Sequence, residues 1–156
     1  VVILTDVLKA VAALSAGVAI FGTLFTPESG MLLFAKYWGA LFCLLGHMFP
    51  CMFGFKGGKG ILSGGTIAIM IDWRIGAMIG VVFFAAYLLT QYVSLGSVLS
   101  AATFGIGFAV FHHDSLPVML GGIFMAVLTI YQHRGNIFRL IKGEERKTNL
   151  FGGKKQ

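Results

Sequence analysis

The sequence predicts an all-α fold, a polytopic transmembrane helical bundle of six helices, and both composition and patterning lead to this prediction. Of the 156 residues, 57% are hydrophobic and only 12% are charged, and the mean hydropathy is +0.87. Soluble domains contain about 25% charged residues. The apolar residues form continuous runs without period-two alternation, which favours helices over barrel strands. A chain of this length is expected to form one domain, residues 1–156.

Six apolar runs define the predicted helices, which we place at residues 10–26, 31–50, 61–71, 75–90, 93–111 and 116–131. A helix needs about 20 residues to cross 30 Å of hydrocarbon, and most of the runs approach this length. The third run is short, and Gly64 and Gly65 near its start indicate a helix that begins deep in the bundle or is shielded by its neighbours. Gly76 with Gly80, and the glycine pair at 121–122, indicate close contacts between helices.

Basic residues gather on one predicted side of the membrane. Successive crossings bring to one side the loops 51–60 and 91–97 and the tail from residue 133, and to the other the loops 27–30, 72–74 and 112–116. Ten of the 12 Lys and Arg residues share the first side: Lys9, Lys56, Lys59, Arg134, Arg139, Lys142, Arg146, Lys147, Lys154 and Lys155. Because cytoplasmic loops are enriched in Lys and Arg, this side is predicted to be cytoplasmic.

The net charge narrows the class of partner. A charge of +6 in so apolar a chain indicates an anionic partner, which is a phosphate-bearing substrate, anionic lipid headgroups, or both. The absence of an extended basic face argues against nucleic acid. Cys43 and Cys51 follow neither a zinc nor a disulfide pattern, and neighbouring side chains at 112–114 converge poorly on a metal. We therefore expect neither a metal nor a cofactor.

The first polar motif is the loop 53–60, with the sequence Phe-Gly-Phe-Lys-Gly-Gly-Lys-Gly, preceded by Gly-His-Met-Phe-Pro at 46–50. Glycines let backbone N–H groups turn toward an anion, and lysines add positive charge. The nucleotide P-loop pattern is absent because position 53 is Phe and position 60 is Gly, so ATP binding is disfavoured. The alternative is a positive-inside turn with flexible glycines, in which His47 is a packing residue.

The second polar motif is the turn 91–97, where Ser94 and Ser97 lie three residues apart on one face of a helix. Either serine can cap that helix, and its free N–H groups also attract an anion. Capping alone is the simpler interpretation of each serine.

The third polar motif is the segment 133–145, in which His133, Asn136 and Arg139 recur at steps of three and share a face if the segment is helical. The alternative is a basic amphipathic tail that lies on anionic lipid. That alternative explains the lysines but leaves His133 and Asn136 unexplained. Asp6 and Lys9, also three apart, are expected to form a structural pair.

Together these motifs resemble the bacterial integral-membrane glycerol-3-phosphate acyltransferase family that uses acyl phosphate as donor, commonly called PlsY. Residues 46–60 are similar to the family's glycine-rich motif, residues 92–97 to its serine segment, and residues 133–145 to its C-terminal motif. The Asp-x-x-Lys at 6–9 is similar to the residues that follow the family's first motif. Family members have seven membrane helices, so we expect the first helix and the first motif to be missing here. Because residue 1 is Val and no leader pattern is present, the N-terminus is expected to be cut.

The resemblance implies an activity and a location. The acyl group of an acyl phosphate passes to the 1-hydroxyl of glycerol 3-phosphate, which gives 1-acylglycerol 3-phosphate (lysophosphatidic acid) and phosphate, the first step of phospholipid synthesis. The implied location is a bacterial inner membrane, with the active site on the cytoplasmic face. Acyl phosphate is a mixed anhydride with a good leaving group, so proximity and charge stabilisation suffice without a covalent acyl-enzyme.

On this basis we assign the site residues. The catalytic residues are His133, Asn136 and Ser94. The phosphate-binding residues are Lys56, Gly57, Gly58, Lys59, Gly60, Ser63, Ser97 and Arg139. His133 is either a phosphate donor or the general base on the substrate hydroxyl, whose proton the substrate's own phosphate can also accept. Residues 61–63 are Ile-Leu-Ser where the family usually has Val-Ala-Thr, and Ser63 retains a hydroxyl.

Two other functions compete with the enzyme hypothesis. A small transporter for a phosphorylated metabolite also uses membrane-embedded cations and broken helices, but it needs polar groups at the midplane, whereas the polar motifs here share one side. A membrane scaffold with a basic tail predicts that Lys56→Ala or His133→Ala is silent in an acyl-transfer assay.

Overall fold

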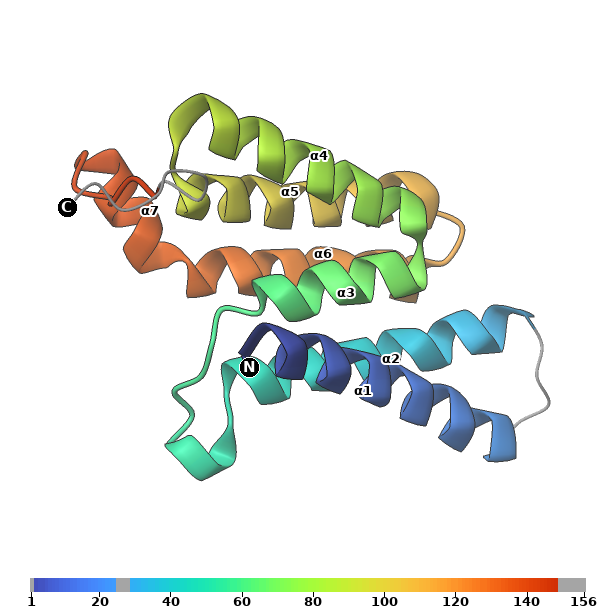
Figure 1. The fold of residues 1–156 in the computed structure, drawn as a ribbon. Coiled ribbons are helices and arrows are strands. Elements are labelled where there is room, and N and C mark those ends of the chain that lie inside the picture. Colours follow the sequence, from blue (N-terminus) through green and yellow to red (C-terminus); the bar gives the residue numbers. More distant parts are fainter. Residues whose placement is uncertain (1, 25–28, 149–156) are drawn as a thin grey trace.

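The computed structural model describes residues 2–24 and 29–148, and in this part of the chain all regular secondary structure is helical, with no strand. The elements are α1 Val2–Leu24, α2 Ser29–Met48, the 3-10 turn η1 Cys51–Phe53, α3 Ile61–Ile71, α4 Trp73–Thr90, α5 Val93–Phe111, α6 Leu116–Gln132 and α7 Arg134–Ile141. The six longer helices run along a common direction, and α7 turns away at one end (Figure 1). The all-α bundle predicted from the sequence is therefore confirmed.

The predicted number of six helices is one too low for the described residues. The polar motif from 133 forms a separate helix, α7, which is bent by 57° from α6. The first helix also begins at Val2 rather than near residue 10. Asp6 and Lys9 break the apolar run there, but their side chains pair at 2.5 Å, so the charges do not end the helix.

Length and hydropathy agree with a membrane-spanning bundle. Four stretches are long and apolar enough to cross a membrane, and the bent pair α6 and α7 provides a fifth if it is one span. The helix α3 has only 11 residues, which span about 16 Å at 1.5 Å per residue. It is short as expected, and it contributes the fully buried Ile67 and Ala68 to the core.

Glycines set how closely several helices approach. A Cβ atom on Gly39 of α2 would lie 2.6 Å from the Ala13 carbonyl oxygen of α1, and one on Gly122 of α6 would lie 2.1 Å from the Phe108 ring of α5. The contact expected at 121–122 is therefore present. Of the other expected pair, Gly76 packs against Ile69, whereas Gly80 has open space around it.

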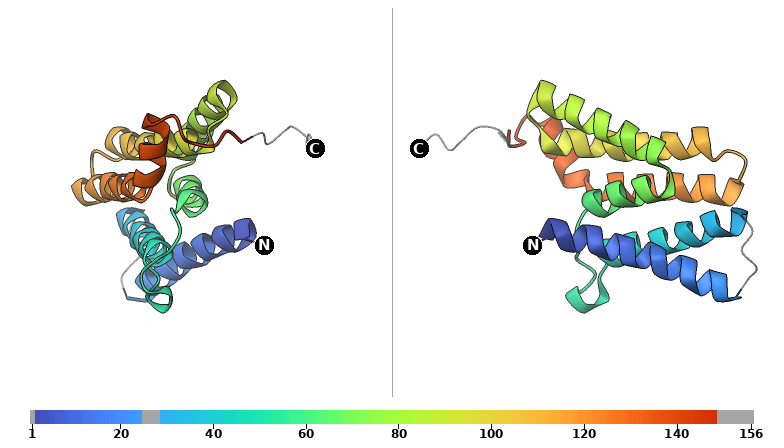
Figure 2. Two further views of the ribbon diagram at one scale, coloured as in Figure 1. Left: turned by 90° about the vertical axis from the view of Figure 1, so that its left-hand side faces the viewer. Right: turned by 45° about the vertical axis from the view of Figure 1, so that its right-hand side comes forward.

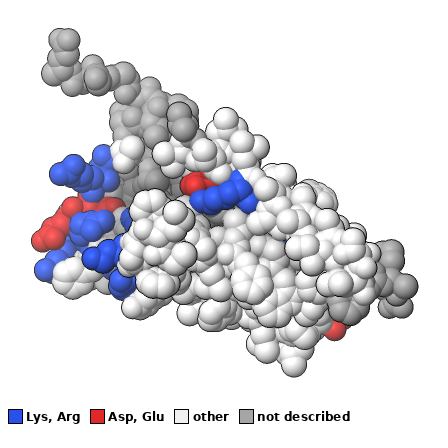
Figure 3. Space-filling view, turned by 90° about the horizontal axis from the view of Figure 1, so that it is seen from below, with Lys and Arg blue, Asp and Glu red and all other residues white. Residues whose placement is uncertain are grey.

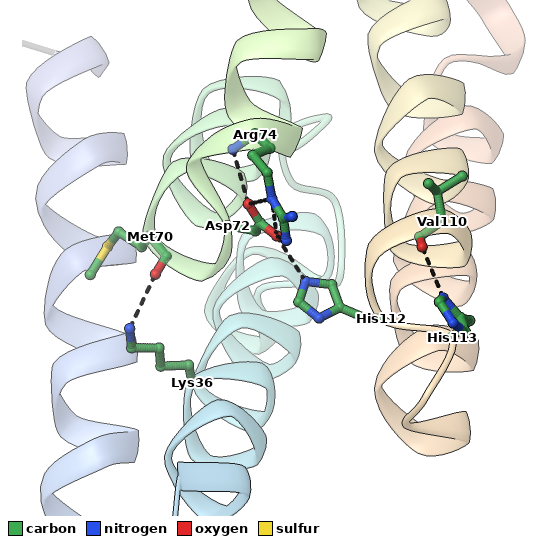
Figure 4. A network of polar contacts seen from close by, with 7 residues as sticks. All are labelled: Lys36, Met70, Asp72, Arg74, Val110, His112 and His113. Atoms are coloured by element: carbon green, nitrogen blue, oxygen red, sulfur yellow. Dashed lines mark hydrogen bonds and ion pairs between the residues drawn. The ribbon is translucent and has the colours of Figure 1, made fainter.

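A polar network closes the end of the bundle where α3 meets α4 (Figure 4). Asp72 caps α4 by accepting a hydrogen bond from the Arg74 backbone N–H at 3.0 Å, and the Arg74 guanidinium donates to the same carboxylate at 2.6 Å. These hydrogen bonds hold the pKa of Asp72 below its usual range. The His112 Nε2 atom lies 3.4 Å from the carboxylate, which links this turn to the end of α5. The network thus joins the loops 72–74 and 112–116, which the predicted order of membrane crossings places on the same side.

The opposite end of the bundle collects the three polar motifs. The turn between α4 and α5, the loop before α3 and the bend between α6 and α7 all lie at this end (Figures 1 and 2). Lys and Arg side chains gather toward the same end, whereas most of the remaining surface in this view is uncharged (Figure 3). Of the predicted loop 27–30, residues 27–28 lie outside the described residues, and Ser29 and Gly30 already belong to α2.

The contact between α1 and α2 gives a test of the packing. We expect Gly39→Ala to destabilise the protein by about 1 to 3 kcal/mol, because the added methyl group meets backbone atoms that cannot rotate away. Gly22→Ala in α1 is the matched control, since its Cβ atom meets nothing within 4 Å, and it should be neutral or slightly stabilising. Thermal unfolding in detergent measures both variants, and equal melting temperatures would contradict the packing argument.

Candidate active site

The loop before α3 folds back onto the end of α2. The N–H groups of Gly57 and Gly58 donate to the carbonyl oxygens of Met48 and His47 at 3.2 and 3.0 Å. A Cβ atom on Gly57 would lie 2.1 Å from the His47 carbonyl oxygen, and one on Gly58 would lie 2.0 Å from the His47 Nε2 atom. The close approach of this loop to the end of α2 therefore requires glycine at both positions. The N–H groups of both glycines already have partners. Phosphate binding by these two N–H groups stays a prediction.

The first turn of α3 presents unused donors. Gly60 adopts a left-handed conformation with φ 77° and precedes the helix, whose first hydrogen bond runs from the Gly64 N–H to the Gly60 carbonyl at 2.7 Å. The N–H groups of residues 61–63 therefore have no carbonyl partner within the helix, and the helix dipole makes this end positive. The Ser63 hydroxyl is fully buried in this turn and makes no hydrogen bond among the described residues. Such an arrangement favours anion binding.

A chain of hydrogen bonds joins this loop to α7. The Lys59 ammonium donates to the Asn136 Oδ1 atom at 2.5 Å, and the Asn136 Nδ2 group donates to the Glu145 carboxylate at 2.9 Å. The Arg139 Nε group donates to the other oxygen of that carboxylate at 2.7 Å. We call these four residues the cationic network. Because it contains two cations and one anion, it keeps one surplus positive charge.

Glu145 is the site residue that the sequence assignment missed. It lies in the C-terminal motif but is not among the assigned site residues. In the structure, Asn136 and Arg139 both donate to its carboxylate. Partial desolvation raises the pKa of Glu145, but the hydrogen bonds from Asn136 and Arg139 and the adjacent Ser94 hydroxyl outweigh it, so the pKa lies below its usual range. The buried Ser94 hydroxyl lies beside this carboxylate with a geometry short of a full hydrogen bond.

A short strap, residues 143–148, holds Glu145 in place. Gly143 ends α7 in a left-handed conformation with φ 71°, and the chain then returns over the turn between α4 and α5. There the Thr148 N–H donates to the Gln91 carbonyl at 2.9 Å, and the buried Tyr87 hydroxyl donates to the Thr148 carbonyl at 2.8 Å. The strap therefore fixes the acceptor on which Asn136 and Arg139 converge.

His133 occupies the bend between α6 and α7 and is almost fully buried, at 2% exposure. Its Nδ1 atom lies 2.8 Å from the Thr129 carbonyl oxygen. Because a carbonyl only accepts hydrogen bonds, Nδ1 carries the proton in the neutral ring. The Nε2 atom is then the one that can accept a proton.

Three of the assigned site residues, Ser94, Ser97 and Lys56, differ from what the sequence indicated. Ser94 and Ser97 do not cap α5, because Tyr92 occupies the cap position and no side chain bonds there, so the capping interpretation is wrong. The Ser97 hydroxyl instead donates to the Val93 carbonyl of its own helix at 3.0 Å. Lys56 is exposed, and its side chain makes no hydrogen bond or ion pair with any described residue. The structure therefore joins Lys59, but not Lys56, to the cationic network.

An apolar groove begins beside this polar site. Its volume is about 350 Å³, and it is lined mainly by residues of α3, α4, α5 and α6, together with Val7 of α1 and Leu44 of α2. It starts at Gly60 and Ile61, directly after Lys59, and continues to Ile69 and Gly76. In residues 2–24 and 29–148, no group of three or more His, Cys, Asp or Glu side chains is placed to hold a metal ion.

The fold and the site define a class of protein: a multi-pass α-helical membrane protein with a cationic site and an apolar groove, joined in the chain where Lys59 is followed by the groove residue Gly60. The model of one family, glycerol-3-phosphate acyltransferase, matches residues 1–143. The chain belongs to this glycerol-3-phosphate acyltransferase family.

Individual relatives agree with this assignment. The glycerol-3-phosphate acyltransferase of Francisella tularensis subsp. mediasiatica is 37% identical over 108 residues, which cover 69% of this chain and 52% of the relative. That of Anaeromyxobacter dehalogenans is 39% identical over 118 residues, which cover 72% and 58%. The chain thus spans about half the length of the curated relatives it matches.

Two solved structures share the fold. A crystal structure of PlsY, an integral membrane glycerol 3-phosphate acyltransferase, in its glycerol 3-phosphate form has a TM-score of 0.76 and 31% identity, covering 97% of this chain and 73% of that one. The lysophosphatidic acid form has a TM-score of 0.74 and 33% identity, covering 95% and 71%.

The lowered pKa of Glu145 predicts a pH-dependent stability. The stabilisation is fully present above the unfolded pKa of about 4.3 and is lost as the pH falls through the lower folded pKa. Native protein should therefore exceed Glu145→Gln in melting temperature at pH 7, and this difference should shrink below about pH 4. Glu144→Gln is the control, because Glu144 is the exposed neighbouring carboxylate. A difference between native protein and Glu145→Gln that stays constant from pH 7 to pH 3 would contradict the role of this carboxylate.

Proposed function

We propose that this chain forms the membrane-embedded catalytic part of an acyltransferase that moves a fatty acyl group from acyl phosphate to the 1-hydroxyl of glycerol 3-phosphate. The observation that carries the proposal is the cationic network, whose Lys59 directly precedes Gly60 in the lining of the apolar groove. Both substrates bear phosphate, and one also bears a fatty chain, so a site for them needs positive charge beside an apolar channel. Membership of the family and the ligand forms of the two PlsY structures support the same reaction.

The phosphate groups are proposed to bind between α3 and α7. Lys59 and Arg139 supply the positive charge, and Glu145 neutralises only one of the two. The free N–H groups at the start of α3 and the unpaired Ser63 hydroxyl supply further donors. Charged hydrogen bonds to phosphate are among the stronger ones in proteins, so this set of donors suits a dianion.

The chemistry needs one proton acceptor and no covalent intermediate. The substrate hydroxyl oxygen attacks the acyl carbon, the bond from that carbon to the phosphate oxygen breaks, and inorganic phosphate leaves with the bonding electrons. The hydroxyl proton passes to His133 Nε2, the atom left unprotonated by the contact of Nδ1 with Thr129, or to the substrate's own phosphate. The cationic network stabilises the charge on the departing phosphate.

The fatty chain of the acyl donor is proposed to lie in the groove. From Gly60 to Ile69 the groove follows nine residues of α3, or about 13 Å of helix. Its lining is almost wholly apolar, and exposed residues such as Phe84 lie at its edge. An apolar lining along the bundle also disfavours the transporter hypothesis, which requires polar groups at the midplane.

The proposed location is the cytoplasmic face of a bacterial inner membrane. Lys and Arg side chains gather at the end of the bundle that contains the site (Figure 3), and the positive-inside rule assigns such an end to the cytoplasm. Water-soluble glycerol 3-phosphate then reaches the polar site from one side, while the acyl donor enters from the lipid.

An acyl-transfer assay on the purified full-length protein tests the function. We expect formation of lysophosphatidic acid with acyl phosphate as donor, and little or none with acyl-CoA or an acyl carrier protein thioester. Lys59→Met should lower kcat/KM at least 100-fold, because a charge-assisted contact to phosphate is worth about 3 kcal/mol. Lys36→Met, which lies at the other end of the bundle, is the control. The hypothesis fails if no donor supports acyl transfer, or if both lysine variants retain full activity.

The groove predicts a selective effect on chain length. Gly80 lines the groove and has open space around its Cβ position, so Gly80→Leu should narrow the groove while the protein still folds. We expect the KM for a long-chain acyl phosphate to rise roughly tenfold, the equivalent of one or two displaced methylene groups, with a smaller rise for a short-chain donor. Gly22→Leu in α1 is the control, and equal changes in KM for both donors would contradict binding in the groove.

A further inference from the structure

A second polar cluster lies between α1 and α2, outside the cationic network. It consists of Asp6, Lys9 and His47, which we call the α1–α2 cluster. The Lys9 ammonium donates to the Asp6 carboxylate at 2.5 Å and also to the His47 Nδ1 atom, and the carboxylate lies 3.7 Å from that same nitrogen. The side chains of Asp6 and His47 are only 14% and 15% exposed. Charges in such helices are expensive and tend to serve function, yet the proposed chemistry uses none of these three.

The cluster fixes the orientation of the His47 ring. An ammonium group has three donors and no acceptor, so Nδ1 must be the accepting nitrogen and Nε2 the protonated one. Asp6 in turn holds the ammonium in place. The ring is therefore tethered by one edge, while its other edge faces the loop before α3.

That other edge is in contact with Gly58. A Cβ atom at this position would lie 2.0 Å from Nε2 and 2.6 Å from Cε1 of His47. The His47 carbonyl oxygen also accepts the Gly58 N–H at 3.0 Å. His47 thus contacts Gly58 through both its backbone and its ring, and the next residue is Lys59, which reaches Asn136.

We propose that Asp6, Lys9 and His47 are positioning residues of the proposed phosphate site. They hold the His47 ring against Gly58 and thereby set the place from which Lys59 reaches Asn136 and the substrate phosphate. This inference rests on the proposed function of Lys59. It assigns to a cluster on α1 and α2 a role in a site whose other members lie on the loop before α3, on α3 and α7, and on the strap.

The alternative is a purely structural role, in which the cluster only joins α1 to α2. Those helices already pack closely through Gly17 and Gly39, whose Cβ positions lie 2.7 and 2.6 Å from backbone oxygens of the facing helix. A purely structural cluster predicts lower thermal stability with unchanged phosphate affinity. A positioning cluster predicts a change in affinity that depends on Lys59.

The experiment measures the affinity for phosphate ligands rather than turnover. A failure of this proposal can then be distinguished from a failure of the acyltransferase hypothesis. Full-length protein in detergent is titrated with glycerol 3-phosphate and with inorganic phosphate, and binding is followed by the rise in melting temperature. We expect Lys9→Met to weaken binding roughly tenfold and Lys9→Arg to restore most of it. Lys36→Met is the matched control, because this second half-buried lysine donates to the Met70 carbonyl at 3.3 Å in the other part of the bundle; it should bind like the native protein.

A double-mutant cycle tests the route through Lys59. In a Lys59→Met background, Lys9→Met should weaken binding less than twofold further, because its effect passes through the missing ammonium. Equal losses in both backgrounds, or a lowered melting temperature with native affinity, would overturn the proposal. If neither ligand stabilises the native protein, the phosphate site itself is refuted, whatever the outcome for acyl transfer.

A steric substitution tests the contact between the His47 ring and Gly58 independently. Gly58→Ala should weaken phosphate binding in the native protein because the new methyl group strikes the His47 ring. In a His47→Ala background the ring is gone, so the same substitution should cost several-fold less. Equal costs in both backgrounds would overturn the role of the ring.

Discussion

The hydrogen bond from the Lys59 ammonium to the Asn136 side chain is the interaction on which the site depends. It joins two segments 77 residues apart, the loop before α3 and the helix α7. Lys59 is exposed, and the Asn136 side chain offers its ammonium an oxygen acceptor without cancelling its charge. Glu145 then orients the amide by accepting from its other end, so the positive charge is kept for a ligand.

Both ends of the bundle hold polar side chains. At one end, Asp72 and Arg74 pair and cap α4 (Figure 4), while the buried His112 Nε2 atom makes no hydrogen bond among the described residues. At the other end, the buried hydroxyls of Ser63 and Ser94 lack hydrogen-bond partners among the described residues, and the first N–H groups of α3 have no partner in their helix. Unsatisfied buried groups call for an explanation, and the proposed phosphate site accounts for the unpaired donors at this end.

Much of the architecture was open to prediction because the bilayer imposes simple rules. Continuous apolar runs identified the six longer helices, and the bias of Lys and Arg identified the end that carries the site (Figure 3). The sequence left open whether the segment with His133, Asn136 and Arg139 is helical, and the structure forms α7 from Arg134 to Ile141. What the spacing did not reveal was that this helix is separate and bent by 57° from α6, because a bend at a polar residue leaves no periodic signal.

By itself, the sequence determined the class of protein, the polar motifs and their common end, since these follow from local hydropathy and charge. Only the tertiary structure decided which residues meet. It gave Gly57 and Gly58 a role in close packing on His47, which a sequence can equally interpret as phosphate binding. It also brought Glu145 into the cationic network and left Lys56 exposed. Both outcomes depend on how α2, α7 and the strap fold back across one another, and contacts between residues so distant in the chain leave no local pattern.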